Sequence, residues 1–160
     1  MADARFEDGA EKPVRLMAAN EEDLPVISAL LQDALIESRN ISWMKRHGRV
    51  AILMSRFRWE DQAAAQRSGR PFERVQSMLV IDSARALRAQ GVSPRDPDLI
   101  LSALSLDFMA RVDGSGTLTL TLSGDGALAV DVECIDIRLQ DVSRPYLSHS
   151  NQVPDHKIDG

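Results

Sequence analysis

The chain has 160 residues and a formal net charge of −5, from 19 basic and 24 acidic side chains, and 44% of its residues are hydrophobic. This length and composition predict one globular domain and exclude a wholly disordered chain; with only 4% aromatic residues, its core must be mainly aliphatic. The single cysteine excludes a disulfide framework and multi-cysteine metal sites, and the sequence contains no apolar run long enough to span a membrane.

The two ends of the sequence are polar. Residues 1–13 are charge-rich and lack apolar periodicity, which predicts a disordered leader, and a polar tail is predicted over residues 143–160. Between them, residues 14–142 are predicted to form a single domain. The first eight residues are acidic, whereas secretory and transit peptides are basic, so a cytoplasmic location is expected.

The first predicted elements are a strand and a helix. The apolar run Val14–Ala18 predicts the strand. Asp23 is suited to begin the helix, because its carboxylate can accept backbone N–H groups and Pro25 is tolerated in the first turn. The apolar side chains that follow recur at helical spacing and predict an amphipathic helix, at Leu24, Ile27, Leu31 and Ala34.

A pair of strands is predicted next, over residues 41–45 and 50–59, with Gly48 in the turn between them. In the second strand, Arg56 and Arg58 share a face with three apolar residues, Val50, Ile52 and Met54. This strand is therefore predicted either to be buried on both sides at its start or to carry a bulge. Phe57 and Trp59 lie on the opposite face, where the pattern favours a core role over an exposed aromatic–arginine patch.

The middle of the chain contains weaker signals. Residues 61–70 are predicted to be a loop or a short solvated helix, and Phe72–Ile81 a strand. The segment Ala84–Gln90 fits either a helix or a strand. A turn-rich connection then leads to a strand that begins near Ile100, whose alternation is blurred by neighbouring apolar residues.

The clearest pattern lies near the C-terminal end. Leu118, Leu120 and Leu122 alternate with threonines, and a second alternating run from Leu128 to Cys134 follows an Asp-Gly turn, which predicts a hairpin. A closing helix is predicted from near Cys134, because three apolar residues after it fall at helical spacing, at Ile135, Leu139 and Val142.

These elements predict an α+β fold of mostly antiparallel strands. They would form two curved sheets or a partly open barrel similar to a pleckstrin-homology domain, with one helix after the first strand and a C-terminal helix that plugs an open end.

Three segments resemble a known family: 23–34 (DLPVISALLQDA), 55–60 (SRFRWE) and, after the glycine hairpin, 131–139 (DVECIDIRL). The sequence resembles a chiefly alphaproteobacterial family known as domain of unknown function 2948, and the similarity extends over nearly all of residues 14–142. The resemblance implies a bacterial cytoplasmic protein. It implies no activity and therefore assigns no catalytic residues.

Several residues are candidates for an enzyme site. Cys134 lacks an evident histidine base and falls on the buried face of its strand, which favours a small core residue over a nucleophile. Asp131 and Glu133 share the outer face of the same strand, which favours salt bridges to Arg56 or Arg58 over a cation site. No catalytic residue, metal site or cofactor is therefore assigned.

The charge distribution gives a further candidate site. Residues 39–74 contain nine basic and three acidic side chains between acidic flanking segments. Either these charges pair with the flanks, or they form a basic face for an anion, a nucleic acid or a partner. The residues of such a face would be Arg46, Arg49, Arg56, Arg58, Arg67, Arg70 and Arg74.

The functional prediction is a non-catalytic binding or regulatory module that docks a protein partner, through an exposed sheet edge or a charged face. An enzyme that uses Cys134, or Asp131 with Glu133, is one alternative. Binding of anions or nucleic acid by the basic segment is another. Self-association through sheet edges is compatible with the pattern, and no membrane association is expected.

Overall fold

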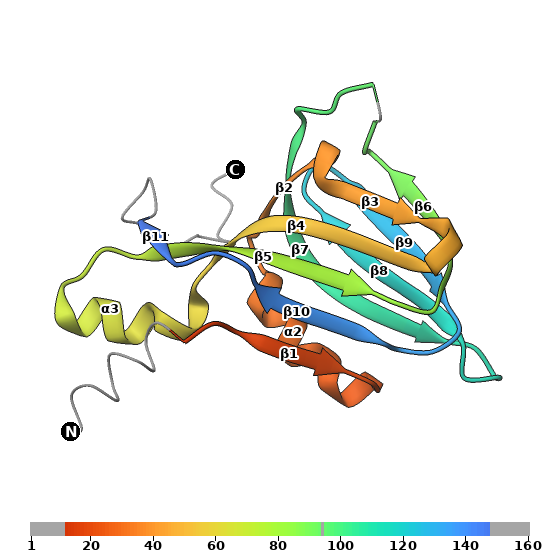
Figure 1. Cartoon of the computed structure of the whole chain (residues 1–160), viewed down its shortest axis with the longest axis horizontal. Helices are drawn as coiled ribbons and strands as arrows, with labels where there is room; N and C mark the ends of the chain where they lie inside the picture. The colour runs from red at the N-terminus through yellow and green to blue at the C-terminus, as the bar shows by residue number, and fades with distance from the viewer. Residues whose placement is uncertain (1–11, 94, 148–160) are drawn as a thin grey trace.

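The computed structural model describes residues 12–93 and 95–147; most of the predicted leader and tail lies outside these residues. The described chain consists mainly of antiparallel strands, with two α-helices (Figure 1). The strands are β1 (Arg15–Ala18), β2 (Leu35–Glu37), β3 (Ile41–Met44), β4 (Arg49–Phe57), β5 (Glu73–Ile81), β6 (Ala84–Gln90), β7 (Ile100–Ala110), β8 (Gly116–Leu122), β9 (Gly126–Val132), β10 (Ile137–Asp141) and β11 (Tyr146–Leu147). The α-helices are α2 (Leu24–Leu31) and α3 (Gln62–Ser68), and the short 3-10 helices are η1 (Glu21–Asp23), η2 (Ser38–Asn40), η3 (Lys45–His47) and η4 (Trp59–Asp61).

The strands form one open sheet in the order β1-β10-β5-β4-β2-β7-β8-β9-β6. Two more strands pair beside this path, β3 with β4 and β11 with β5. β11 lies beyond residue 142, so strand structure continues into the segment predicted as tail. The open, mostly antiparallel sheet confirms the predicted fold class at this level, and Ala84–Gln90, left open by the sequence, is the strand β6.

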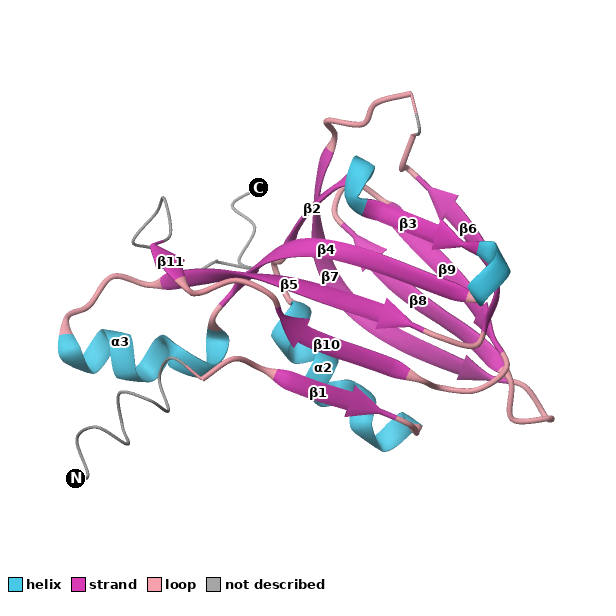
Figure 2. Cartoon of the chain, in the orientation of Figure 1, coloured by secondary structure: helices cyan, strands magenta, loops and turns pink. Residues whose placement is uncertain are grey.

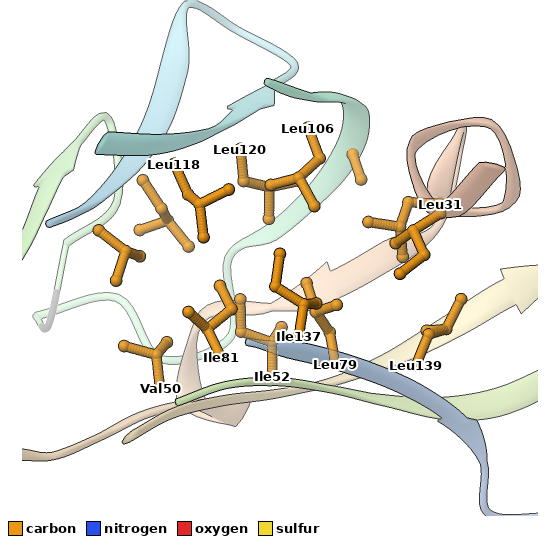
Figure 3. Packing of buried hydrophobic residues seen from close by; sticks show 14 of the residues in the cluster. Leu31, Val50, Ile52, Leu79, Ile81, Leu106, Leu118, Leu120, Ile137 and Leu139 are labelled. Atoms are coloured by element: carbon orange, nitrogen blue, oxygen red, sulfur yellow. The ribbon is translucent and has the colours of Figure 1, made fainter. Parts of the chain in front are cut away.

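The sheet bends back on itself, so that its two halves enclose an aliphatic core. Figure 3 shows Leu118 and Leu120 from β8 pointing toward Ile52 and Ile81 from the opposite half. The predicted hairpin β8–β9 is confirmed, and its alternation is the reason it forms one wall of the core: every second residue is buried. Asp125 and Gly124 adopt positive φ angles of 63° and 68° in the turn.

The helix α2 begins at Leu24, directly after Asp23, but the Asp23 side chain does not cap it as predicted. Asn20 Oδ1 accepts the backbone N–H of Asp23 at 3.1 Å, and Asp23 Oδ2 in turn accepts the N–H of Ala19 at 3.0 Å, which fixes the entry into the helix. The helix buries Leu24, Ile27 and Leu31 against the core. It packs on β7 and also contacts β1 and β4 (Figure 2), so α2 occupies the place between the two halves of the sheet.

The predicted C-terminal helix is wrong. Residues 137–141 form β10, which lies between β1 and β5. Ile135, Leu139 and Val142 do fall at helical spacing, but Val142 is 52% exposed, and burial instead follows the period-two series Ile135, Ile137, Leu139 and Asp141. The pleckstrin-homology-like arrangement, which depended on that helix, is not confirmed.

The structure of β4 explains why its sequence places arginines and apolar residues on the same face. Its pairing with β5 is regular, without a bulge. Val50, Ile52, Met54 and Arg56 all point to the buried side, so the arginine continues the core face of the strand. The residues predicted as a loop or short helix after this strand form η4 and α3.

Candidate functional site

The strand β7 has a second strand partner along only part of its length. On one side it pairs with β8 from Ala103 to Ala110. On the other side β2 pairs with residues 100–102, and Ala103 exchanges two backbone hydrogen bonds of 2.8 Å with Asp33 and Ala34. No strand in the described chain pairs with β7 on this side beyond Ala103. Residues 104–110 therefore form a free sheet edge.

A bulge determines which backbone groups this edge presents. The β7–β8 register shifts between Ala103 and Ser105, so Leu104 has no partner on β8. Beyond the bulge, Leu106 N donates to Ser28 Oγ of α2 at 3.0 Å, away from β8, whereas Arg111 N donates to Ser115 O at 2.7 Å, across the hairpin end. Because backbone groups alternate along a strand, the N–H and C=O groups of Phe108 face the free edge with those of Leu106.

A groove runs between this edge and α2. Its volume is about 490 Å³, and its wall combines apolar and polar surface. The apolar lining residues are Leu24, Pro25, Ala29, Leu104, Leu106 and Phe108. Leu106 is buried, while Leu104 remains 38% exposed, so the groove presents apolar surface above a fixed core. The unpaired edge of β7 and the groove thus lie side by side.

The rim of the groove is acidic. Glu21 and Asp107 line it, together with the polar residues Ser28 and Gln32, and no lysine, arginine or histidine does so. Asp107 accepts a hydrogen bond from the hydroxyl of Ser105 at 3.1 Å. Neither carboxylate makes an ion pair with another described residue. The groove therefore carries negative charge that a ligand can neutralise.

These features fit the addition of an extended peptide. A peptide strand beside residues 104–110 would satisfy backbone groups that the fold leaves without a strand partner, and its alternate side chains would face the groove. The edge gives affinity through main-chain hydrogen bonds. The apolar lining and the two carboxylates select the side chains.

The fold divides the predicted basic face between the two ends of β4. Arg46 lies in η3 and Arg49 begins β4, while Arg56 and Arg58 are at the far end of the strand. Arg70 and Arg74 lie near that far end, where Arg74 pairs in register with Phe57, and Arg67 is exposed on α3. The structure therefore brings Arg56, Arg58 and Arg70 together around shared carboxylates. Arg74 lies with Phe57 on the opposite face of the sheet, and Arg46 and Arg49 lie at the other end of β4.

Arg56 is the centre of a buried ionic cluster. Its side chain is fully buried and binds Glu60 through two hydrogen bonds of 2.8 and 2.9 Å, and Asp141 through two of 3.0 and 3.2 Å. Asp141 also accepts the hydroxyl of Ser77 at 2.7 Å and the backbone N–H of Val14 at 2.9 Å. Burial opposes the charge on Arg56, but the hydrogen bonds and charges of Glu60 and Asp141 outweigh it and raise its pKa.

Arg58 extends this cluster toward η4 and β5. Its guanidinium lies 3.0 Å from Glu73 and 3.5 Å from Asp61, and Arg70 forms a two-bonded pair with Asp61. Burial raises the pKa of Glu73, and the nearby Asp61 carboxyl adds to the effect. Burial acts the same way on Asp61, but the Arg70 hydrogen bond and the charges of Arg58 and Arg70 prevail and lower its pKa.

The predicted pairing of Asp131 and Glu133 with Arg56 or Arg58 is wrong. Asp131 instead pairs with Arg88 and Arg111 and accepts the hydroxyl of Thr117 at 2.8 Å, and Glu133 pairs with Arg85 at 3.3 Å. The reason is register: β9 pairs with β6 and β8, on the opposite half of the sheet from β4.

Cys134 is exposed, which contradicts its predicted burial. The buried alternation of β9 ends at Val132, and Cys134 falls in the bend that leads to β10. Cys134 lines neither the groove nor the charged hollow described below. His149 and His156, two of the three histidines, lie outside the described residues.

The aromatic pair follows its predicted core role in part. Phe57 is 1% exposed and packs on Trp59 with ring centroids 4.7 Å apart. Trp59 is half-buried, and its indole N–H donates to Gln32 O at 2.9 Å. The pair thus anchors the end of β4 to the end of α2.

No group of three histidine, cysteine, aspartate or glutamate side chains suited to a metal ion occurs among the residues that the structure describes. The helices of the described chain are also too short or too polar to cross a membrane.

Comparison with protein families identifies the chain's relatives. The model of the family described as "Protein of unknown function (DUF2948)" matches residues 14–156. The chain belongs to the DUF2948 family. Comparisons with the curated proteins and with the solved structures found no match.

Sequence reasoning missed the groove of this DUF2948 protein. The only local signal was the blurred alternation around Leu101, Ala103 and Leu104, which the bulge in β7 now explains. The sequence of α2 predicts an amphipathic helix but does not show which strand lies beside its exposed face.

Proposed function

We propose that this DUF2948 protein is a binding module that docks an extended segment of a protein partner as an added strand. The observation that carries the proposal is the free edge of β7 beside an apolar, acid-rimmed groove. The segment would lie antiparallel or parallel to residues 104–110 and bond to the backbone of Phe108 or to the carbonyl of Leu106, whose N–H already donates to Ser28.

The groove also defines the chemistry of the partner. Leu104 and Phe108 offer apolar contact to alternate side chains of the added strand. Glu21 and Asp107 favour lysine or arginine beside those apolar residues, because opposite charges steer association and exclude acidic competitors. The favoured ligand is therefore a short extended segment with alternating apolar residues and basic flanks.

A second copy of the chain fits the groove less well. Two copies joined edge to edge by a two-fold axis would bring the same acidic rim, Glu21 and Asp107, close to its own copy. Like charges at such an interface are unfavourable. A basic segment of another protein is the occupant that complements the charge.

Photo-crosslinking from the groove tests the proposal. The photoreactive residue p-benzoylphenylalanine would replace Ala29, which lines the groove and is exposed, in the full-length protein within its native cells. Mass spectrometry of the crosslinked product should identify a partner segment with apolar residues and neighbouring lysine or arginine. The same photoreactive residue at Val112, fully exposed on the β7–β8 loop, is the matched control.

Charge reversal sharpens this test. Asp107→Lys should abolish the Ala29 crosslink, whereas Glu133→Lys, on the bend after β9, should leave it unchanged. A crosslinked segment rich in acidic residues, equal crosslinking from both positions, or no crosslink from Ala29 would each contradict the proposal.

The proposal includes the location of the protein in the cell. We propose that the protein works in the bacterial cytoplasm, as its resemblance implies. An exposed, unpaired cysteine, Cys134, suits a reducing compartment, where thiols persist without pairing.

A further inference from the structure

A second hollow lies beside the ionic cluster. Its volume is about 390 Å³. Its lining combines residues just before β1, at Lys12 and Pro13, with residues just after β10, at Ser143, Arg144 and Pro145. The hollow thus lies between the segment before β1, whose Val14 bonds to Asp141 at the end of β10, and the segment after β10, which continues beside β5.

The floor of the hollow is charged and internally paired. Arg58 lies there, and Glu73 binds it at 3.0 Å. Asp141 is held by Arg56 at 3.0 Å and by two further hydrogen bonds from Ser77 and Val14. The carboxylates of the floor are therefore already engaged by cations and hydrogen-bond donors of the fold.

The rim of the hollow adds two cations that form no ion pair within the described chain. Lys12 and Arg144 both line the hollow and are exposed. Neither makes an ion pair with any residue that the structure describes. Arg58 on the floor is itself paired with Glu73 and Asp61. The exposed cations Lys12 and Arg144 therefore supply the uncompensated positive charge, so the hollow attracts anions.

We propose that this hollow binds a small oxyanion, a carboxylate or phosphate group on a short apolar body. Arg144 and Lys12 bind the charged group, because a guanidinium offers paired N–H donors and an ammonium a compact charge. Pro13, Val75 and Pro145 line the rest of the space and contact the apolar body. The site is separate from the groove between α2 and β7 and does not depend on the function proposed for it.

Calorimetric titration of the full chain with four probes tests this site. Phenyl phosphate and benzoate carry an apolar ring, whereas inorganic phosphate and acetate do not, and ionic strength is held constant with chloride. At least one ring-bearing probe is expected to bind with a Kd below about 1 mM, and more tightly than its ring-free counterpart. The two ring-bearing probes distinguish a phosphate ligand from a carboxylate ligand.

Charge variants locate the bound probe. Arg144→Gln should weaken binding about tenfold, and the double variant K12Q/R144Q should abolish it. The matched control K45Q/R46Q removes the same two charge types from η3, at the opposite end of β4, and should change Kd less than about twofold. Glu73→Gln should tighten binding of the probe about fivefold, because it removes a negative carboxylate from the floor of the hollow.

Several results would overturn the proposal. These are no saturable binding of any probe, equal weakening by K45Q/R46Q and K12Q/R144Q, or weaker binding by the Glu73→Gln variant. The NMR signal of the Arg58 Nε–H group gives a direct second readout on the unaltered protein. It should shift with the bound fraction of probe, and an unmoved signal would place the probe elsewhere.

Discussion

At the scale of single residues, charge in this protein is organised by partners distant in sequence. Asp131 on β9 receives hydrogen bonds from Arg88 on β6 and from Thr117 on β8. The Arg88 hydrogen bond, followed by that of Thr117, lowers the pKa of Asp131 to about 2. Asp131 thereby joins the three strands on the outer face of this half of the sheet.

This lowered pKa predicts how stability depends on pH. A carboxylate whose pKa is lower in the folded state stabilises the fold above its unfolded pKa, and the contribution is lost as pH falls toward the folded value. Asp131→Asn should lower the free energy of unfolding by about 1 kcal/mol at pH 7, since an ion pair at the surface contributes little.

Urea unfolding followed by circular dichroism measures the effect. The difference between wild type and Asp131→Asn should shrink as pH falls from about 4 to about 2. Glu133→Gln is the matched control, because Glu133 is 60% exposed in its pair with Arg85, and should change stability by less than about 0.5 kcal/mol. A difference for Asp131→Asn that stays constant with pH would contradict the assignment.

At the scale of elements, Arg56 connects three parts of the chain. It lies on β4, and its partners are Glu60 in η4 and Asp141 at the end of β10. Asp141 holds Val14 N, just before β1, at 2.9 Å. One guanidinium thus fixes the order β1-β10-β5-β4 at its charged end.

Removing the positive charge of Arg56 should lower the free energy of unfolding. Arg56→Met leaves Asp141, whose side chain is 3% exposed, without its main cation, and should cost about 3–5 kcal/mol of unfolding free energy. The double variant R56M/D141L removes both charges and should cost less than the sum of the single changes Arg56→Met and Asp141→Leu. Denaturant unfolding of the four proteins measures the coupling.

An exposed pair provides the comparison. Arg85→Met removes an arginine that is 55% exposed and paired with Glu133, and should cost less than about 1 kcal/mol. If Arg56→Met costs no more than this, or if the double variant is additive, the cluster does not hold these strands together.

The same elements show what a sequence can predict. The β8–β9 hairpin was predictable because alternation and its turn lie within one short segment. The strand β10 was not, since three apolar residues fit helical spacing by coincidence, and the strands that select the period-two alternative lie far away in sequence, at residues 15–18 and 73–81. The sequence left open whether Arg56 belongs to an exposed basic face or pairs with an acidic segment, because its partner Asp141 is 85 residues away.

At the scale of the whole molecule, the two candidate sites depend on where the fold ends. The groove exists because β2 leaves β7 after residue 102 and α2 takes its place without pairing. The charged hollow exists because the segment before β1 lies beside the end of β10, and the segment after β10 continues along β5. Neither site could be predicted from local pattern, because each is built from segments that meet only when the sheet has folded.

Amide hydrogen exchange at the edge of β7 tests the central claim most directly. The partner segment found by crosslinking would be added as a synthetic peptide, and exchange would be followed by NMR residue by residue. The amide of Phe108, which faces the free edge, should exchange rapidly in the free protein and become protected when peptide is bound. The amide of Met109, on the β8 side, should be protected in both states. Binding that leaves the Phe108 amide unprotected would contradict strand addition.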